Sequence, residues 1–214
     1  MSEDKAGRFQ SRDVAILNFP NIFTPRAFKG KNGVAQGEPK FDAALELAPD
    51  SPDLKNMKAA AVAVARAKWP DRDLKVDFQF PWTLGDKLAD KAKAKGKDRE
   101  SSRGLVVLTA RSQYAPRLSV IEKGDVVDYF DERRPLAKDA FYSGVKVGFV
   151  VTFNAYEGVG SNPDGVNAYL DWLISTKSGK RLVTSASGAD VFKGYAGRVS
   201  DEDPTTADAG DDEF

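Results

Sequence analysis

Residues 142–156 read YSGVKVGFVVTFNAY, and this stretch decides the fold class. Large apolar side chains occupy every second position from Val145 to Phe153, and mostly small or polar residues stand between them. That two-residue period is typical of a β-strand with one buried face. Gly144 and Gly148 leave room for the close approach of another backbone, as the coiled strands of a closing barrel require. We therefore predict a long strand of a β-barrel here.

Shorter strands are expected on both sides of this stretch. A strand beginning at Val14 should stop at Pro20, and the segment from Asn21 to Gly37 has the composition of turns. We assign Phe78, Phe149, Phe153 and Trp172 to the core. Alternating or β-branched runs predict strands at 14–19, 41–47, 74–80, 105–108, 117–121, 126–130, 166–174 and 181–184.

A single α-helix is predicted at residues 52–68. Ser51 can cap it, Pro52 suits its first position, and apolar residues recur at three- and four-residue spacing until Trp69-Pro70 ends it. One helix among many short strands is typical of a mainly β protein with the oligonucleotide-binding fold, a five-stranded Greek-key barrel with insertions. The basic segment from Asp86 to Arg103 is expected to be a mobile loop or a short exposed helix.

The charges divide the chain into two parts. The formal net charge is zero, with 32 Lys and Arg against 32 Asp and Glu. Since residues 201–214 hold seven acids and no base, residues 1–200 carry 32 bases against 25 acids, a net charge of +7. We predict one domain at 1–200 and a disordered acidic tail at 201–214.

Several classes of enzyme are excluded by residues that the chain lacks. It contains no His and no Cys, so it has no Ser-His-Asp triad, no cysteine nucleophile, no disulfide and no His- or thiolate-bound metal. We expect no enzyme activity, no resident metal and no cofactor. The polar N-terminal residues, and a longest apolar run of only seven residues at 59–65, predict neither secretion nor a membrane span.

A magnesium-dependent nuclease is the alternative from the enzyme class. Asp125, Asp128, Asp131 and Glu132 could in principle hold Mg²⁺. Asp125 also fits a Gly-Asp turn, however, and two arginines follow Glu132 directly, so their spacing defines no catalytic motif.

Basic residues interleaved with aromatic ones predict a surface for single-stranded nucleic acid. Aromatic rings stack on bases, each stack contributing about 1–3 kcal/mol, while Lys and Arg neutralise phosphates. Stacking reads no sequence, so binding would be general. For any one of these residues, packing or solvation is the commoner role. The candidate DNA-binding residues are Lys29, Lys31, Trp82, Arg111, Tyr114, Arg117, Tyr142, Lys146 and Tyr156, of which Arg111, Tyr114 and Arg117 are expected in a polar loop after a strand.

The acidic tail ends in a lone aromatic residue. Asp211, Asp212 and Glu213 precede Phe214. Because the acidic segment before it is expected to be disordered, Phe214 is not expected to pack in the core. Such an end suits docking into a basic-rimmed apolar pocket of a partner. The same acids could also occupy the protein's own basic groove and compete with DNA.

Several short motifs, in this order, resemble those of the bacteriophage single-stranded DNA-binding proteins of the oligonucleotide-binding fold, the short-tailed-phage type and its relatives. The resemblance spans most of the chain, and none of its motifs is a catalytic one. They are residues 17–25 (LNFPNIFTP), 68–70 (KWP), 109–112 (TARS) with Pro116, 141–144 (FYSG), 154–156 (NAY) and 165–166 (GV).

The resemblance implies a non-enzymatic protein of phage replication and recombination in the cytoplasm of an infected bacterium. Such a protein coats single-stranded DNA, removes hairpins and promotes strand annealing. By the same resemblance, the tail residues Asp211–Phe214 would contact the phage DNA polymerase and helicase-primase, and a homodimer is possible. The remaining alternative is a protein–protein interaction adaptor whose basic surface binds an acidic host protein.

Overall fold

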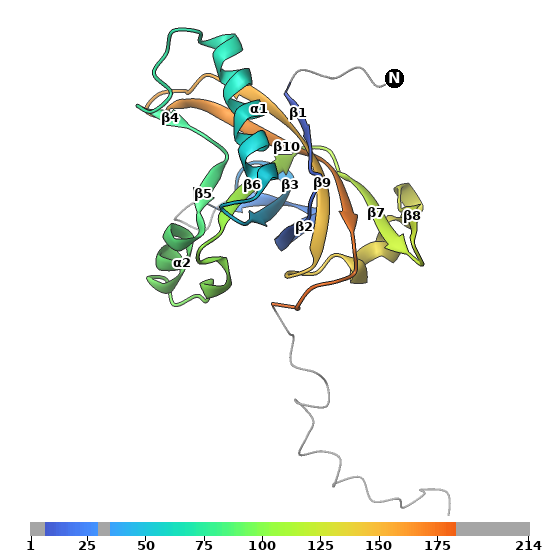
Figure 1. The fold of residues 1–214 in the computed structure, drawn as a ribbon. Coiled ribbons are helices and arrows are strands. Elements are labelled where there is room, and N and C mark those ends of the chain that lie inside the picture. The colour runs from blue at the N-terminus through green and yellow to red at the C-terminus, as the bar shows by residue number, and fades with distance from the viewer. Residues whose placement is uncertain (1–6, 30–34, 183–214) are drawn as a thin grey trace, which may run out of the picture. The chain divides into compact units, whose positions relative to one another are not determined.

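Ten strands of one sheet form the body of the molecule (Figure 1). The computed structural model describes residues 7–29 and 35–182, and the predicted mainly β class is confirmed. The strands are β1 (Arg8–Gln10), β2 (Ala15–Lys29), β3 (Ala35–Leu47), β4 (Phe78–Gln79), β5 (Trp82–Leu84), β6 (Val106–Ser112), β7 (Arg117–Glu122), β8 (Asp125–Asp128), β9 (Lys146–Tyr156) and β10 (Asp164–Ser175).

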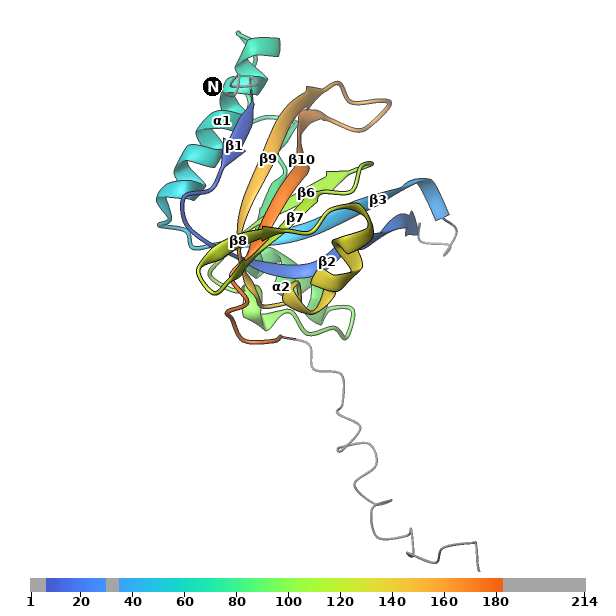
Figure 2. The ribbon, with the colours of Figure 1, turned by 90° about the vertical axis from the view of Figure 1, so that its right-hand side faces the viewer.

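Among the strands of residues 7–29 and 35–182, no ladder of hydrogen bonds closes the sheet. Its strands follow the order β5-β6-β3-β2-β9-β10-β7-β8, with β1 paired to β9 and β4 paired to β10. Strands β9 and β10 run across β2 and β3 (Figure 2). This brings the first half of β10 beside β6, although the two form no ladder. The closed barrel that the glycines suggested therefore has an open seam.

Strand β9 lies at the centre of the core, as its alternation predicts. Val145, Val147, Phe149, Val151 and Phe153 are all buried. The strand pairs with β1, β2 and β10. One strand therefore joins the N-terminal and C-terminal parts of the sheet.

Helix α1 (Pro52–Lys68) has the predicted bounds and packs against β9 and β1. It buries Leu54 and Met57 and, one and two turns after Met57, Ala61 and Ala65. The neighbouring Asp53 is also buried, and its Oδ2 accepts hydrogen bonds from the backbone N–H groups of Arg12 at 2.8 Å and Asp13 at 2.7 Å. The first turn of the helix thereby holds the connection from β1 to β2.

Helix α1 is not the only helix, and the short exposed helix that the sequence left open for residues 86–103 is present. A second helix, α2 (Gly85–Lys93), and two 3₁₀ helices, η1 (Glu100–Ser102) and η2 (Asp131–Ala140), are present in the part of the chain that the structure describes. Gly85 starts α2 with its backbone against the carbonyl of Ser102, and Ala89 is buried one turn later. The small apolar face of α2 was too short for the sequence pattern to distinguish a helix from a loop.

Strand β2 does not stop at Pro20, because it continues to Lys29 in a long hairpin with β3. The register between the two strands shifts between Asn18 and Asn21, and again between Asn21 and Arg26. Pro20 lies inside the first irregularity, where the missing N–H interrupts no regular ladder. The expected turn-rich segment is therefore mostly strand, except for residues 30–34, which lie outside the described residues.

Two other predicted strands differ from the structure. The strand expected at 74–80 shrinks to the two residues of β4, and Val76 is 60% exposed. Arg181 and Leu182 are not in a strand, and the remainder of the stretch 181–184 lies outside the described residues. So do residues 183–200 of the predicted domain and the tail 201–214. No helix in the described part is both long and apolar enough to cross a membrane.

Gly144 is required where the end of the described chain crosses the start of β9. Its φ is +102°, and an added Cβ would collide with the carbonyl oxygen of Lys180. Gly124 makes a useful comparison, because its φ is +93° but a Cβ there would meet nothing within 4 Å.

We expect Gly144→Ala to lower the free energy of unfolding by about 3 kcal/mol, from backbone strain plus the collision, and Gly124→Ala by about 1 kcal/mol, from strain alone. Urea unfolding followed by tryptophan fluorescence measures both. Equal destabilisation of the two variants would contradict the close approach of Lys180.

Candidate nucleic-acid interface

An unpaired stretch of β10 creates the first of two grooves. On the side away from β9, β10 pairs with β4 at Asp164 and Gly165 and with β7 from Trp172 onward. Between these points, residues 166–171 have no strand partner on that side among the described residues. A groove of about 540 Å³ lies there, between β10 and β6. We call it the seam groove.

Arg111 supplies positive charge to the seam groove. It lies within β6, where Val106, Leu108 and Ala110 point into the core, so Thr109 and Arg111 face outward into the groove. The expectation that Arg111 follows a strand in a loop was wrong, because β6 continues to Ser112. Arg117 likewise belongs to a strand, β7, and of the three only Tyr114 lies in the loop between them.

Tyr156, Phe80 and Tyr169 supply the aromatic surface of the seam groove. The Tyr156 hydroxyl donates to Oε1 of Gln79 at 3.1 Å. Burial, and then the negative charge of Asp164, raise the pKa of Tyr156, so the phenol stays protonated at neutral pH and remains a donor. Gly165 leaves the space that the Tyr156 hydroxyl occupies.

Trp172 lines the second groove, of about 820 Å³, together with Arg8, Tyr114, Arg117 and Tyr169. We call it the Trp172 groove. The indole Nε1 donates to Oγ of Ser119 at 2.7 Å. The Arg117 guanidinium lies 5.2 Å from the centroid of the indole, and Phe130 meets the indole edge-on at 5.8 Å. These contacts fix an aromatic ring and a cation at the groove wall.

The assignment of Trp172 to the core was wrong because β10 contains a bulge. The register against β9 shifts between Leu170 and Trp172. Before the shift, Val166, Ala168 and Leu170 are buried; after it, Leu173 and Ser175 are buried. An inserted residue exchanges the two faces of a strand. Trp172 thus joins the outer face, on which Tyr169 already lies.

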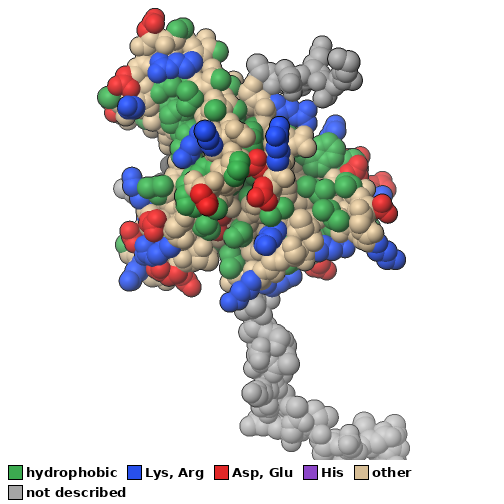
Figure 3. All heavy atoms as spheres, in the orientation of Figure 1, with side chains coloured by type: hydrophobic (Ala, Val, Ile, Leu, Met, Phe, Trp, Pro, Cys, Tyr) green, Lys and Arg blue, Asp and Glu red, His purple; other side chains and the backbone are tan. Residues whose placement is uncertain are grey.

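The two grooves form one surface, because Ser112, Gln113 and Tyr169 line both. A single acid, Asp171, lines them, and its Oδ2 accepts a hydrogen bond from Thr152 at 2.6 Å. On the face shown in Figure 3, basic, acidic and hydrophobic side chains are intermixed. The bases that line the surface are Arg8, Lys40, Arg111 and Arg117, and the aromatic residues are Phe80, Tyr114, Tyr156, Tyr169 and Trp172.

Four predicted site residues line this surface, namely Arg111, Tyr114, Arg117 and Tyr156. Trp82 lies beside it, stacked on Phe80 with ring centroids 4.5 Å apart, but it does not line either groove.

The other four predicted site residues do not line either groove or have side chains outside the described part of the structure. Tyr142 donates from its hydroxyl to the carbonyl of Gly179 at 3.0 Å and lies under Arg181, and Lys146 is exposed at the start of β9. Lys29 ends β2 and nothing is described of its side chain, whereas Lys31 is outside the described residues. Neither Tyr142 nor Lys146 reaches the grooves.

Sequence reasoning missed Arg8, Lys40, Phe80, Tyr169 and Trp172. Tyr169 could have been found, since it alternates with the buried Ala168 and Leu170. The other side chains come together only through the sheet order and the bulge.

The carboxylates of the nuclease alternative do not form a site. Asp128 accepts a hydrogen bond from Oγ of Ser119 at 2.6 Å. Within the described ranges, no three His, Cys, Asp or Glu side chains are grouped so that they could hold a metal ion.

Comparison with known proteins gives one family and a set of related folds. The family model described as the single-stranded DNA-binding protein of Enterobacter phage Enc34 matches residues 12–205. No curated protein matches the sequence.

Solved structures of the bacteriophage Enc34 single-stranded DNA-binding protein share the fold. The structure in complex with single-stranded DNA has 16% sequence identity and a TM-score of 0.59, covering 84% of this chain and 91% of that one. A second structure of the Enc34 single-stranded DNA-binding protein has 16% identity and a TM-score of 0.58, covering 86% of this chain and 90% of that one. With a family model that matches nearly the whole described chain, this protein belongs to the family of the phage Enc34 single-stranded DNA-binding protein.

Proposed function

We propose that this protein binds single-stranded DNA without regard to sequence, along the seam groove and the Trp172 groove. The observation that carries the proposal is the composition of the joined surface, which is lined by four basic, one acidic and five aromatic side chains. The family, whose namesake is a phage single-stranded DNA-binding protein, supports it.

The division of labour follows from the geometry. The nucleobases of the single-stranded DNA stack on aromatic rings. Two such rings are Tyr114, which is 81% exposed, and Trp172, whose orientation is held by a hydrogen bond to Ser119. Arg111 and Arg117 neutralise phosphates and release counterions. No chemical step is needed, so the protein acts by coating strands in phage replication and recombination rather than as an enzyme.

Tryptophan fluorescence tests the stacking. The chain has three tryptophans, of which Trp172 alone lines the described grooves. We expect oligo(dT) to quench the fluorescence. Trp172→Phe, which keeps a ring for stacking, should abolish most of the quenching while weakening binding less than about tenfold, or 1.4 kcal/mol. Polarisation of a labelled oligomer measures the affinity independently.

The matched control is Trp69→Phe, because Trp69 packs edge-on against Phe78 and lines neither groove. Quenching should survive in this variant. Full quenching in Trp172→Phe would show that the strand takes another path. Binding to neither oligo(dT) nor duplex in the unaltered protein would favour a protein–protein adaptor instead.

Salt dependence tests the interaction with phosphates. For single strands, each phosphate that the protein neutralises steepens the fall of log K with log salt by about 0.7. We expect Arg111→Ala and Arg117→Ala each to make the slope shallower by about that amount. Lys55→Ala and Lys138→Ala remove exposed charges that line neither groove, and should leave the slope unchanged. Weaker binding with an unaltered slope would argue against neutralisation of a phosphate by these arginines.

The acidic tail is the second part of the proposal, and it rests on the sequence and the resemblance. Residues 201–214 would compete with DNA for the basic grooves, and Asp211–Phe214 would recruit the phage polymerase and helicase-primase. Formation of a homodimer rests on the resemblance alone.

Deletion of residues 201–214 should tighten binding of oligo(dT) several-fold at low salt, because seven competing negative charges are removed. The gain should shrink as salt is added, since screening weakens the competition. Polarisation titrations at two salt concentrations measure both effects. Weaker binding by the truncated protein would contradict competition.

A further inference from the structure

The lysine-rich segment that follows β5 lies at one end of the seam groove. Thr109 lines the groove, and the next residue on the same face of β6 is Val107, which is fully buried. Val107 pairs with Glu46 of β3, whose Oε1 accepts a hydrogen bond from Ser102 of η1 at 2.5 Å. Residues two apart on a strand are about 7 Å apart. The segment 85–103, made of α2 and η1 and called here the α2–η1 segment, therefore begins two residues after Thr83, which lines the groove, and contacts the sheet through Ser102 just beyond it.

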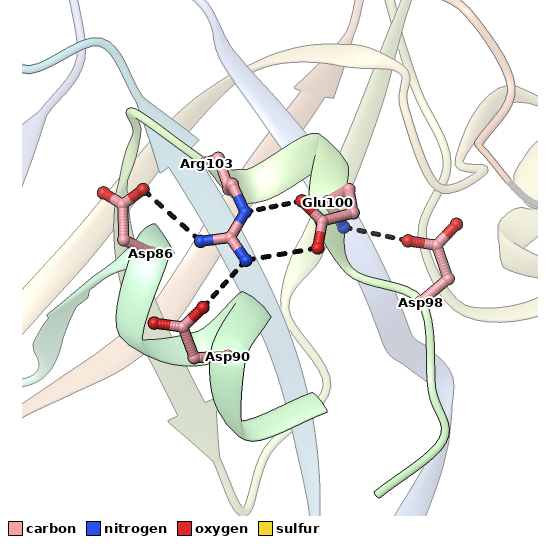
Figure 4. Close-up of polar contacts among 5 residues, drawn as sticks. All are labelled: Asp86, Asp90, Asp98, Glu100 and Arg103. Atoms are coloured by element: carbon pink, nitrogen blue, oxygen red, sulfur yellow. Dashed lines mark hydrogen bonds and ion pairs between the residues drawn. The ribbon is translucent and has the colours of Figure 1, made fainter. Parts of the chain in front are cut away.

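One arginine forms ion pairs with three of the four acidic side chains in the α2–η1 segment (Figure 4). The Arg103 guanidinium contacts Glu100 at 2.5 Å, Asp90 at 2.8 Å and Asp86 at 3.9 Å. The hydrogen bond from Arg103 is the main cause that lowers the pKa of Glu100, so this carboxylate stays charged and paired at neutral pH. The fourth acid, Asp98, accepts a hydrogen bond from the backbone N–H of Glu100 at 2.9 Å.

The five lysines of the same segment take no part in these ion pairs. They are exposed, and none forms an ion pair with a residue that the structure describes. Like charges four residues apart on a helix, such as Lys87 and Lys91, repel each other by a few tenths of a kcal/mol. A polyanion would remove that cost. The lysines are Lys87, Lys91, Lys93, Lys95 and Lys97.

An exposed aromatic residue lies beside the α2–η1 segment. Phe19 is 45% exposed with a φ of +45°, a conformation that costs a residue with a side chain about 1–3 kcal/mol. Its backbone N–H donates to Oδ1 of Asn18 and to Oγ of Ser143, each at 3.0 Å. The guanidinium of Arg99 lies 5.1 Å from the centroid of its ring.

The buried Glu46 connects this aromatic–cation pair to the sheet. Oε1 of Glu46 accepts hydrogen bonds from Asn18 at 3.0 Å and from Ser102, and Oγ of Ser102 also accepts from Nε of Arg99 at 3.2 Å. Both members of the Phe19–Arg99 pair are thus positioned by one carboxylate that is 2% exposed. A strained backbone and a buried carboxylate together hold an exposed ring beneath a cation.

We propose that the α2–η1 segment and the Phe19–Arg99 pair form a second contact surface for the same single strand, beyond the seam groove. Phosphates leaving the groove meet the lysines, and one base stacks on Phe19. This inference rests on the proposed function and extends its path. The surface favours single-stranded over duplex DNA, because an exposed ring flanked by a cation can stack on an unpaired nucleobase, and a duplex has no unpaired nucleobase to offer.

Oligomer length separates the two surfaces. An oligonucleotide-binding domain covers about 4–16 nucleotides, so oligo(dT) of roughly 8 nucleotides should fill the grooves alone and one of roughly 24 should reach the segment. We expect the triple variant Lys87→Ala, Lys91→Ala and Lys95→Ala to reduce the salt slope by about 2 with the long oligomer and to leave it unchanged with the short one. Phe19→Ala should weaken binding of the long oligomer alone.

A matched triple variant, Lys55→Ala, Lys75→Ala and Lys138→Ala, removes the same charge from exposed sites outside the α2–η1 segment and should alter neither slope. Equal reductions with both oligomers, or none with either, overturn the second surface while the proposed function stands. An equal lysine-dependent reduction with a duplex of the same length overturns the choice of a single strand. If the unaltered protein binds neither oligomer, the proposed function fails, and this inference fails with it.

Discussion

The partial pairing of β10 is the constraint on which the proposed binding surface depends. One edge of this strand is paired with β9 along its length, whereas the other is shared between β4 and β7. The gap between them leaves residues 166–171 without a ladder on that side in the described structure. An exposed strand edge invites pairing with another chain unless something covers it. Here the gap becomes a groove, lined by side chains from β6 and β10.

The bulge in β10 adds the second half of the surface. By exchanging the faces of the strand after Leu170, it keeps Leu173 in the core and places Trp172 outside. A regular strand would have buried the indole and exposed the leucine. One inserted residue therefore supplies the ring of the Trp172 groove at little cost to the core, because the apolar residues continue on the buried face.

The zero net charge of the chain conceals how its charges are used. In the α2–η1 segment, Arg103 gathers Asp86, Asp90 and Glu100, and the lysines face outward. In the two grooves, the only acid among the lining residues is held by Thr152. Pairing acids locally leaves positive charge where a polyanion would pass, which neither the total charge nor the charge of a sequence window expresses.

The sequence by itself determined the mainly β class, the core face of β9 and the bounds of α1, because alternation and helical spacing are local patterns that burial enforces directly. It also pointed to Arg111, Tyr114, Arg117 and Tyr156. Only the tertiary structure decided that β2 continues past Pro20 and that Trp172 faces outward. It also decided which basic and aromatic residues share a groove. Bulges, strand order and missing ladders depend on neighbouring strands that are distant in the chain, so no local pattern records them.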